Sequence, residues 1–192
     1  MNVLIVVATK SEITSVNSKK YPVLITGVGM INTAINLSKE LMNNDYSMVI
    51  NMGIAGSFLD DLNNGEVVEV IEDCFSDIGF QDGDSFSEFT DFDLKIKYKV
   101  NPKTKLRKVR GITVNTVHGN QESISGIIKR LNPDIESMEG ASVFKVCEEF
   151  NLPCIQIRSI SNKVEKRNKK KWDLELAIKK LNIEVDKIIE NL

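Results

Sequence analysis

The stretch VLITGVGMINTAINLSKELMN, residues 23–43, decides the fold class. It starts with the apolar run Val23–Thr26, which is typical of a strand buried on both faces, and it turns at Gly27–Gly29. Apolar residues then recur at near-helical spacing, so we expect a helix over about Met30–Asn43. A buried strand followed directly by a helix is the unit from which parallel sheets are assembled.

Similar strand and helix patterns alternate on both sides of this unit. Residues 73–93 are the exception: they are rich in Asp, Ser, Gly and Phe, and we expect a long irregular segment of the kind that is often functional. The alternation predicts one α/β domain, residues 1–192, with three layers (α/β/α) around a central, mostly parallel mixed sheet. Further strands are expected at Val3–Ala8, Met48–Asn51, Val67–Ile71, Arg110–Val114 and Cys154–Ile160, and further helices at Gln121–Arg130, Ala141–Phe150 and Trp172–Asn191.

The composition excludes several classes of protein. The chain is 42% hydrophobic and has 25 Lys and Arg against 27 Asp and Glu, a formal net charge of −2. It therefore has enough apolar residues for a packed core and lacks the positive charge of a nucleic-acid binder.

The charges are unevenly distributed along the chain. Fourteen acidic and no basic residues lie from Glu40 to Asp93, so all 25 basic residues lie elsewhere. Such blocks are typical of solvated faces of opposite sign; a charged ligand site between two such faces is the alternative.

We expect this sequence to carry no signal for secretion or membrane insertion. The apolar run Val3–Ala8 is short and lacks a basic segment before it, and no apolar stretch reaches the roughly 18 residues of a membrane span. Cys74, Cys147 and Cys154 match no zinc-binding spacing, so we expect buried free thiols. We therefore expect a cytoplasmic protein with no cofactor, no metal, and no nucleic-acid or membrane partner.

Three glycine-rich or polar segments fall at the carboxyl ends of expected strands, where open α/β sheets bind ligands. They are residues 27–29, 53–56 and 161–162. The first lacks both the third glycine of a dinucleotide fingerprint and the lysine of a P-loop, so it predicts neither type of nucleotide site. The candidate substrate-binding residues at these ends are Ile54, Ala55, Gly56 and Ser161.

Three charged residues are candidates for chemistry because of their position. Glu12 follows the first strand, and Glu139 precedes an apolar helix, where stabilisation of the helix dipole by about 0.3–1 kcal/mol is the alternative interpretation. Arg158 lies inside a buried strand and needs a partner, which an acidic site at the strand end would provide.

Four segments carry a resemblance to a known family. LITGVG (24–29), VINMGIAG (49–56), ESMEGA (136–141) and IRSISN (157–162), in this order, resemble the purine nucleoside phosphorylase and nucleosidase superfamily. Within it, residues 70–79, 113–119 and 161–172 most resemble the futalosine hydrolases. The resemblance implies a phosphorylase/hydrolase-like fold. It also implies hydrolysis of the N-glycosidic bond of futalosine to hypoxanthine and dehypoxanthine futalosine, in menaquinone biosynthesis.

The resemblance also implies roles for individual residues. Glu12 would activate the attacking water, Glu139 would hold the ribose hydroxyls, and Arg158 would position the water and Glu139. Met138 would pack on the sugar. Trp172 would cover the 5′ substituent, with a place in the core at the start of the last helix as the alternative. The substrate would be a small purine nucleoside, and the chain would form a homodimer or a higher homo-oligomer.

Asn162 is the most informative position for the substrate. Methylthioadenosine nucleosidases carry an aspartate there, which suits the 6-amino group of adenine. An amide offers a donor and an acceptor together, which suits a 6-oxopurine, and a mismatched buried polar group costs on the order of 1–3 kcal/mol. Asn162 therefore favours hypoxanthine as the base. An ordinary turn residue is the alternative interpretation.

Other functions remain open. The alternatives are a methylthioadenosine or adenosylhomocysteine nucleosidase, another 6-oxopurine nucleoside hydrolase, a phosphorylase, and a nucleoside-binding protein without turnover. By the resemblance, Glu12 lies where a phosphorylase would bind phosphate, which favours hydrolysis. Only ten residues, Ile13–Pro22, separate Glu12 from the next strand, so no long element is expected to anchor this segment.

The basic residues 163–171 are expected on a solvated face or near the carboxylate of futalosine. His118 is expected to be structural or at a loop edge.

Overall fold

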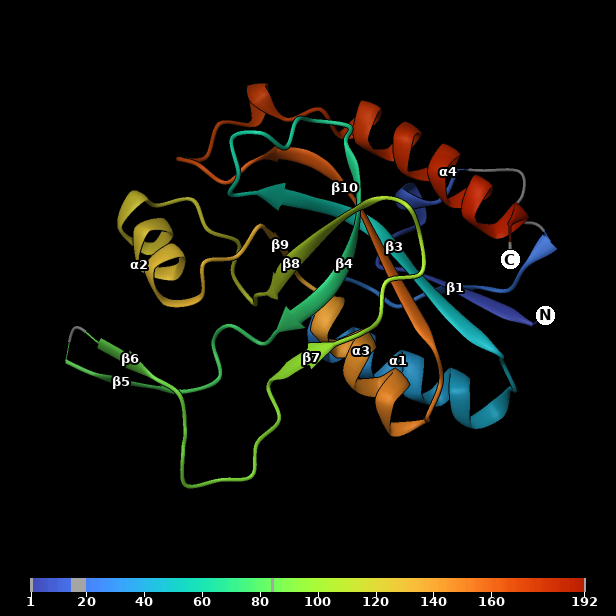
Figure 1. Cartoon of the computed structure of the whole chain (residues 1–192), viewed down its shortest axis with the longest axis horizontal. Coiled ribbons are helices and arrows are strands. Elements are labelled where there is room, and N and C mark those ends of the chain that lie inside the picture. The colour runs from blue at the N-terminus through green and yellow to red at the C-terminus, as the bar shows by residue number, and fades with distance from the viewer. Residues whose placement is uncertain (1, 15–19, 84, 192) are drawn as a thin grey trace.

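The computed structural model describes residues 2–14, 20–83 and 85–191. Within them, one eight-stranded mixed sheet forms the centre of the molecule (Figure 1), and a small hairpin of β5 (Phe80–Asp82) and β6 (Ser85–Ser87) projects from it. The strands of the main sheet are β1 (Val3–Val7), β2 (Val23–Ile25), β3 (Met48–Ser57), β4 (Val67–Cys74), β7 (Lys97–Lys99), β8 (Arg107–Thr113), β9 (Ile135–Ser137) and β10 (Cys154–Lys163). The helices are α1 (Met30–Asn43), α2 (Gln121–Leu131), α3 (Gly140–Glu149) and α4 (Leu174–Glu190), with short 3-10 helices η1 (Lys10–Glu12) and η3 (Lys169–Lys171).

The sheet is mostly parallel, as predicted. β1 pairs in parallel with β2 and β3, β3 with β10, and β8 with β4 and β9. The antiparallel pairs are β4 with β10, β3 with β9, and β4 with β7. Because β3 pairs with both β10 and β9, the pairings β3–β10–β4–β8–β9 return to β3 and close a small barrel at one side of the sheet.

The apolar run of β1 is continuous because both faces of the sheet are covered. Leu4 and Val6 pack in the cluster formed with α1 and α3. Ile5 and Val7 point to the opposite face, into the cluster formed with α4. In Figure 1, α1 and α3 accordingly lie on one side of the sheet and α4 on the other. The predicted three-layer α/β/α architecture is confirmed. None of the helices that the structure describes has the length and apolar character needed to cross a membrane.

Several element boundaries differ from the predicted ones. β3 runs on through residues 53–56, which were expected to end it, and β10 runs on to Lys163. The glycines are tolerated because the two strands pair there: Arg158 lies opposite Gly53, and Asn162 lies opposite Gly56. The short strands β7 and β9 were not predicted, and the segment 73–93 contains the end of β4 and the β5–β6 hairpin. The last helix begins at Leu174, two residues later than expected.

Candidate active site

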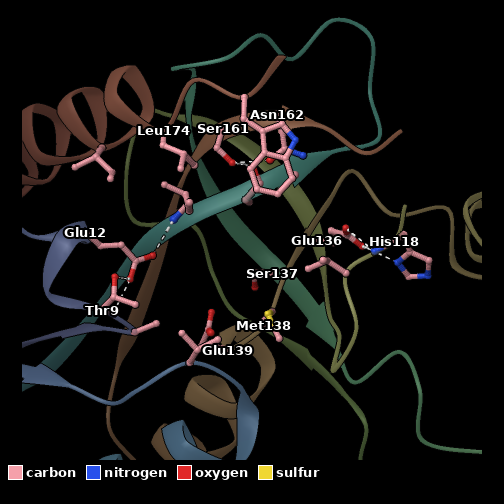
Figure 2. A pocket seen from close by; sticks show the side chains of 18 of the residues that line it. Thr9, Glu12, His118, Glu136, Ser137, Met138, Glu139, Ser161, Asn162 and Leu174 are labelled. Atoms are coloured by element: carbon pink, nitrogen blue, oxygen red, sulfur yellow. Dashed lines mark hydrogen bonds and ion pairs between the residues drawn. The ribbon is translucent and has the colours of Figure 1, made fainter. Parts of the chain in front are cut away.

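One cavity of about 350 Å³ collects most of the candidate residues at the carboxyl ends of β3 and β10 (Figure 2). Its wall is formed by residues that are far apart in the sequence, from the loop after β1 to the start of α4. Arg158 is the one candidate that does not line it. The candidates that do line it are Glu12, Ile54, Ala55, Gly56, Met138, Glu139, Ser161, Asn162 and Trp172.

Glu12 is held by backbone amides although it is buried. Its side chain is 7% exposed, and one carboxylate oxygen, Oε2, accepts a hydrogen bond from the backbone N–H of Thr9 at 2.9 Å. The other oxygen, Oε1, accepts from the N–H of Ile54 in β3 at 3.3 Å. Figure 2 shows Glu12 at one side of the cavity with these contacts. Oε2 also accepts from the hydroxyl of Thr9 at 3.3 Å. The carboxylate is thereby fixed, while Oε1 keeps a lone pair for a further donor.

The segment after Glu12 is anchored by α4. The side-chain amide of Asn182 donates to the carbonyl oxygen of Glu12 at 3.0 Å and accepts from the N–H of Thr14 at 2.9 Å. Residues 15–19 lie outside the described part of the chain. The expectation that no long element anchors this segment is therefore wrong, since a helix some 170 residues away does so. A polar residue on the buried face of α4, beside Leu181, was the available signal in the sequence.

Glu139 is the second carboxylate, and it lies directly before α3. Its Oε1 accepts a hydrogen bond from the N–H of Gly29 at 2.9 Å. Gly29 is the N-cap of α1 and has a φ of +93°, a conformation that favours glycine. The glycine turn thus presents a backbone donor to a carboxylate. Burial raises the pKa of Glu139, while the Gly29 amide and the positive charge of Arg158 act in the opposite direction.

Arg158 lies beneath the cavity, almost fully buried at 1% exposure. Its Nη2 donates to Oδ1 of Asn51 at 2.6 Å, and its Nη1 donates to the carbonyl of Ile157 at 3.2 Å. The expected direct carboxylate partner is absent among the described residues. Gly53 leaves open the space between the arginine and Glu12: a Cβ there would lie 2.9 Å from Glu12 Oε1 and 3.2 Å from Arg158 Nη1. The missing side chain lets the two charged groups approach the same point.

A further buried carboxylate, Asp73, which the sequence did not reveal, lies under the start of α3. Asp73 accepts hydrogen bonds from Thr113 Oγ1 at 3.0 Å and from Gln156 Nε2 at 2.9 Å. Thr113 Oγ1 in turn accepts from the N–H of Ala141 at 2.7 Å. A side chain at Gly140 would overlap Asp73 and Gln156, so only glycine fits there. The network fixes the first turn of α3 and hence the backbone that carries Glu139.

The titration of Asp73 should be visible in the pH dependence of the free energy of unfolding. Burial raises its pKa from 3.8 to about 6, against the effect of its hydrogen bonds and of Arg158. A raised pKa means that the folded state binds the proton more tightly, so this stabilisation is complete below pH 4 and is lost as the pH rises through 6. Its magnitude is about 3 kcal/mol. We expect Asp73→Asn to remove it, because the amide does not titrate.

Urea unfolding of both proteins at pH 4.5, 5.5 and 7.0 checks this. The free energy of unfolding of the wild type should fall relative to that of Asp73→Asn as the pH rises. Contributions of other groups cancel in this difference. A difference that stays constant over this range would contradict the prediction.

His118 and Glu136 form a pair at the opposite side of the cavity that was also missed. Glu136 accepts from the backbone N–H of His118 at 3.1 Å, and its Oε2 lies 2.6 Å from His118 Nδ1 (Figure 2). Both residues line the cavity. A Cβ at Gly56 would lie 3.6 Å from Cγ of Glu136 and 3.3 Å from the amide nitrogen of Asn162. The pair therefore lies next to Asn162 and ties the loop after β8 to β9.

Asn162 lies in β10, so it is not a turn residue. Its Oδ1 accepts from Oγ of Ser161 at 2.8 Å, and its Nδ2 donates to the carbonyl of Lys163 at 2.9 Å. These two contacts fix which end of the amide is the donor. One N–H and one oxygen lone pair remain for a ligand.

Trp172 is half-buried between η3 and α4, so it precedes the last helix.

Comparison with known proteins gives a consistent group of relatives. Residues 7–190 match the family model of the phosphorylase superfamily. A 5′-methylthioadenosine/S-adenosylhomocysteine nucleosidase of Desulfotalea psychrophila is 31% identical over 78% of this chain and 69% of its own length. A futalosine hydrolase of Thermus thermophilus is 24% identical over 82% of this chain and 76% of its own length. A futalosine hydrolase structure from Helicobacter pylori superposes with a TM-score of 0.87 at 18% identity, covering 99% of both chains.

Proposed function

Because the chain belongs to the phosphorylase superfamily, and within it to the nucleosidases that hydrolyse N-glycosidic bonds, we propose that its substrate is futalosine. The products are hypoxanthine and dehypoxanthine futalosine, and the reaction serves menaquinone biosynthesis. The relatives are divided between two substrates, so the base-binding residue decides between them. The observation that carries the proposal is the amide of Asn162, fixed in the cavity between Ser161 and Lys163.

Hydrolysis needs a base for water and an anion near the sugar. The bond between C1′ and the purine nitrogen breaks with its electron pair on the purine, while water adds to C1′ and gives a proton to Glu12. The purine anion then takes up a proton from solvent, and Glu12 releases its proton to solvent. Glu12 suits this role because backbone amides from two elements hold its carboxylate at the cavity wall. Glu139, held by Gly29, would bind the ribose hydroxyls. Arg158 acts from beneath as a positioning residue, since its charge favours the ionised form of Glu139.

The purine would lie at the side of the cavity that holds Asn162, away from Glu12. The free N–H of Asn162 can donate to O6 or N7 of a 6-oxopurine as negative charge develops on the departing base. Its free lone pair can accept from a ring N–H of the same base. Met138 would pack on the sugar, and Ile54, Ala55 and Gly56 would line the path of the nucleoside along β3.

The second candidate is a methylthioadenosine or adenosylhomocysteine nucleosidase. It is favoured by the 31% identity to the Desulfotalea psychrophila nucleosidase and disfavoured by the amide of Asn162. Phosphorolysis is disfavoured because a carboxylate at Glu12, which the proposal places near the sugar, would repel phosphate there. A hydrolase of other 6-oxopurine nucleosides shares the same base contacts and differs only in the 5′ substituent.

The direct test measures release of free base from futalosine, inosine, methylthioadenosine and adenosylhomocysteine, each with and without phosphate. We expect release of hypoxanthine from futalosine at a rate that does not depend on phosphate. Preferential release of adenine would favour the second candidate. A requirement for phosphate would indicate a phosphorylase, and no cleavage of any nucleoside would contradict the proposal.

We also propose that the chain forms a homodimer through the face of β2 and α1. Apolar side chains are exposed there, including Ile31 at 69% and Met42 at 76%. Val28, on the same face, also lines the cavity, so a partner on this face would border the site. A mass measurement in solution tests this.

The three buried free cysteines support the proposed cytoplasmic location, where thiols stay reduced.

A further inference from the structure

The rim of the cavity carries an unusual group of charges. The segment from Lys163 to Lys171, which follows β10, has six basic residues and one acidic residue. Three of these charged residues line the cavity: Lys163, Glu165 and Arg167. Two of the three already have partners in the chain. The ammonium of Lys163 donates to the carbonyl of Leu59, and Glu165 forms an ion pair with Lys171 at 2.7 Å.

Arg167 differs from these two. Among the described residues it forms no ion pair, and its guanidinium carbon lies 5.1 Å from the centre of the Trp172 ring. A guanidinium that stacks on an aromatic ring keeps its N–H donors, which point outward in the plane of the group. The backbone of Arg167 is also close to the loop after β8, since a Cβ at Gly119 would lie 3.7 Å from Cβ of Arg167. A free cation is thus supported from two sides at the cavity rim.

The distribution of charge inside the cavity determines what this cation can bind. Glu12, Glu136 and Glu139 line its wall, so an anionic part of a ligand is repelled from the interior. Arg167 provides attraction only at the rim. A ligand that carries a carboxylate would therefore enter with its neutral purine inward and its carboxylate outward, against Arg167. An aryl group between the two would pack beside Trp172.

We propose that Arg167 binds the carboxylate of the aryl substituent of the nucleoside, and that Trp172 packs against the aryl ring. This rests on the proposed function and deepens it, since it assigns the residue that distinguishes an anionic 5′ substituent from a neutral one. Arg167 is a specificity residue in this role. It does not take part in breaking the glycosidic bond.

The test compares futalosine with its methyl ester, which lacks the carboxylate charge and carries one additional methyl group. Wild-type enzyme should cleave the acid with a kcat/KM about tenfold higher than the ester, as expected for a charge-assisted contact at a partly exposed site. Arg167→Gln should cleave acid and ester with equal kcat/KM, and its loss should appear in KM for the acid. Arg167→Lys should keep part of the preference, because a lysine keeps the charge without the paired donors.

Lys166→Gln is the matched control, because Lys166 is an exposed neighbouring cation that does not line the cavity. It should keep the wild-type ratio. Quenching of Trp172 fluorescence, the only tryptophan in the chain, gives a second measurement: dehypoxanthine futalosine should bind more weakly to Arg167→Gln than to the wild type. If futalosine is cleaved and Arg167→Gln keeps the wild-type ratio, only the assignment of Arg167 is wrong. If neither form is cleaved and methylthioadenosine is, the proposed substrate and this inference both fail.

Discussion

Glu12→Gln is expected to lower kcat for N-glycosidic hydrolysis by about 10²- to 10⁴-fold, the range that loss of a general base produces. Glutamine has nearly the same shape, and its oxygen can still accept from the N–H of Thr9, which is the shorter of the two backbone contacts. Its NH₂ group would then face the N–H of Ile54, a modest local mismatch. What the variant loses is the ability to take a proton from water, so the effect belongs to the chemical step.

The measurement is the single-turnover rate of base release, which separates chemistry from product release. Glu165→Gln is the matched control: Glu165 lines the same cavity, but it is paired with Lys171 at the rim. The control should turn over at close to the wild-type rate. Near-normal turnover by Glu12→Gln would show that another group activates the water.

Short-range patterns predicted the elements that are long or strongly apolar. The run of β1 and the spacing in α1 and α4 are set by burial against the sheet, and this period is visible in the sequence. The ends of β3 and β10 were not predictable in the same way. Glycines and an asparagine are locally typical of a turn. Here they form strands because Gly53 pairs with Arg158 and Gly56 pairs with Asn162.

The same distinction between local and long-range signals holds for the residues of the candidate site. Glu12, Glu139 and Asn162 could be named from motifs at strand ends, and the cavity brings them together. The supporting residues could not be named, since each acts across a long stretch of chain. Asn182 contacts Glu12 from 170 residues away, and Gln156 contacts Asp73 from 83 residues away. A local pattern holds no information on such contacts, which exist only after the sheet has assembled.

Asn162→Asp should reverse the base preference of the enzyme. A carboxylate only accepts hydrogen bonds, so it pairs with the 6-amino group of adenine and repels the O6 of hypoxanthine. Ser161 Oγ can still donate to it, but the contact to the carbonyl of Lys163 becomes one between two acceptors. The variant is therefore expected to fold with a loss of about 1–3 kcal/mol in the free energy of unfolding.

The substrates that isolate this effect are futalosine and the analogue with adenine in place of hypoxanthine, because sugar and aryl group are identical. We expect the ratio of their kcat/KM values to change by about 10²- to 10³-fold in favour of adenine, since each mismatched polar contact costs about 1–3 kcal/mol. Asn168→Asp controls for added charge: Asn168 caps η3 by accepting from the N–H of Lys170, which an aspartate can also do. That control should keep the wild-type ratio. If Asn162→Asp keeps it as well, the amide does not bind the base, and the choice of futalosine over methylthioadenosine loses its main support.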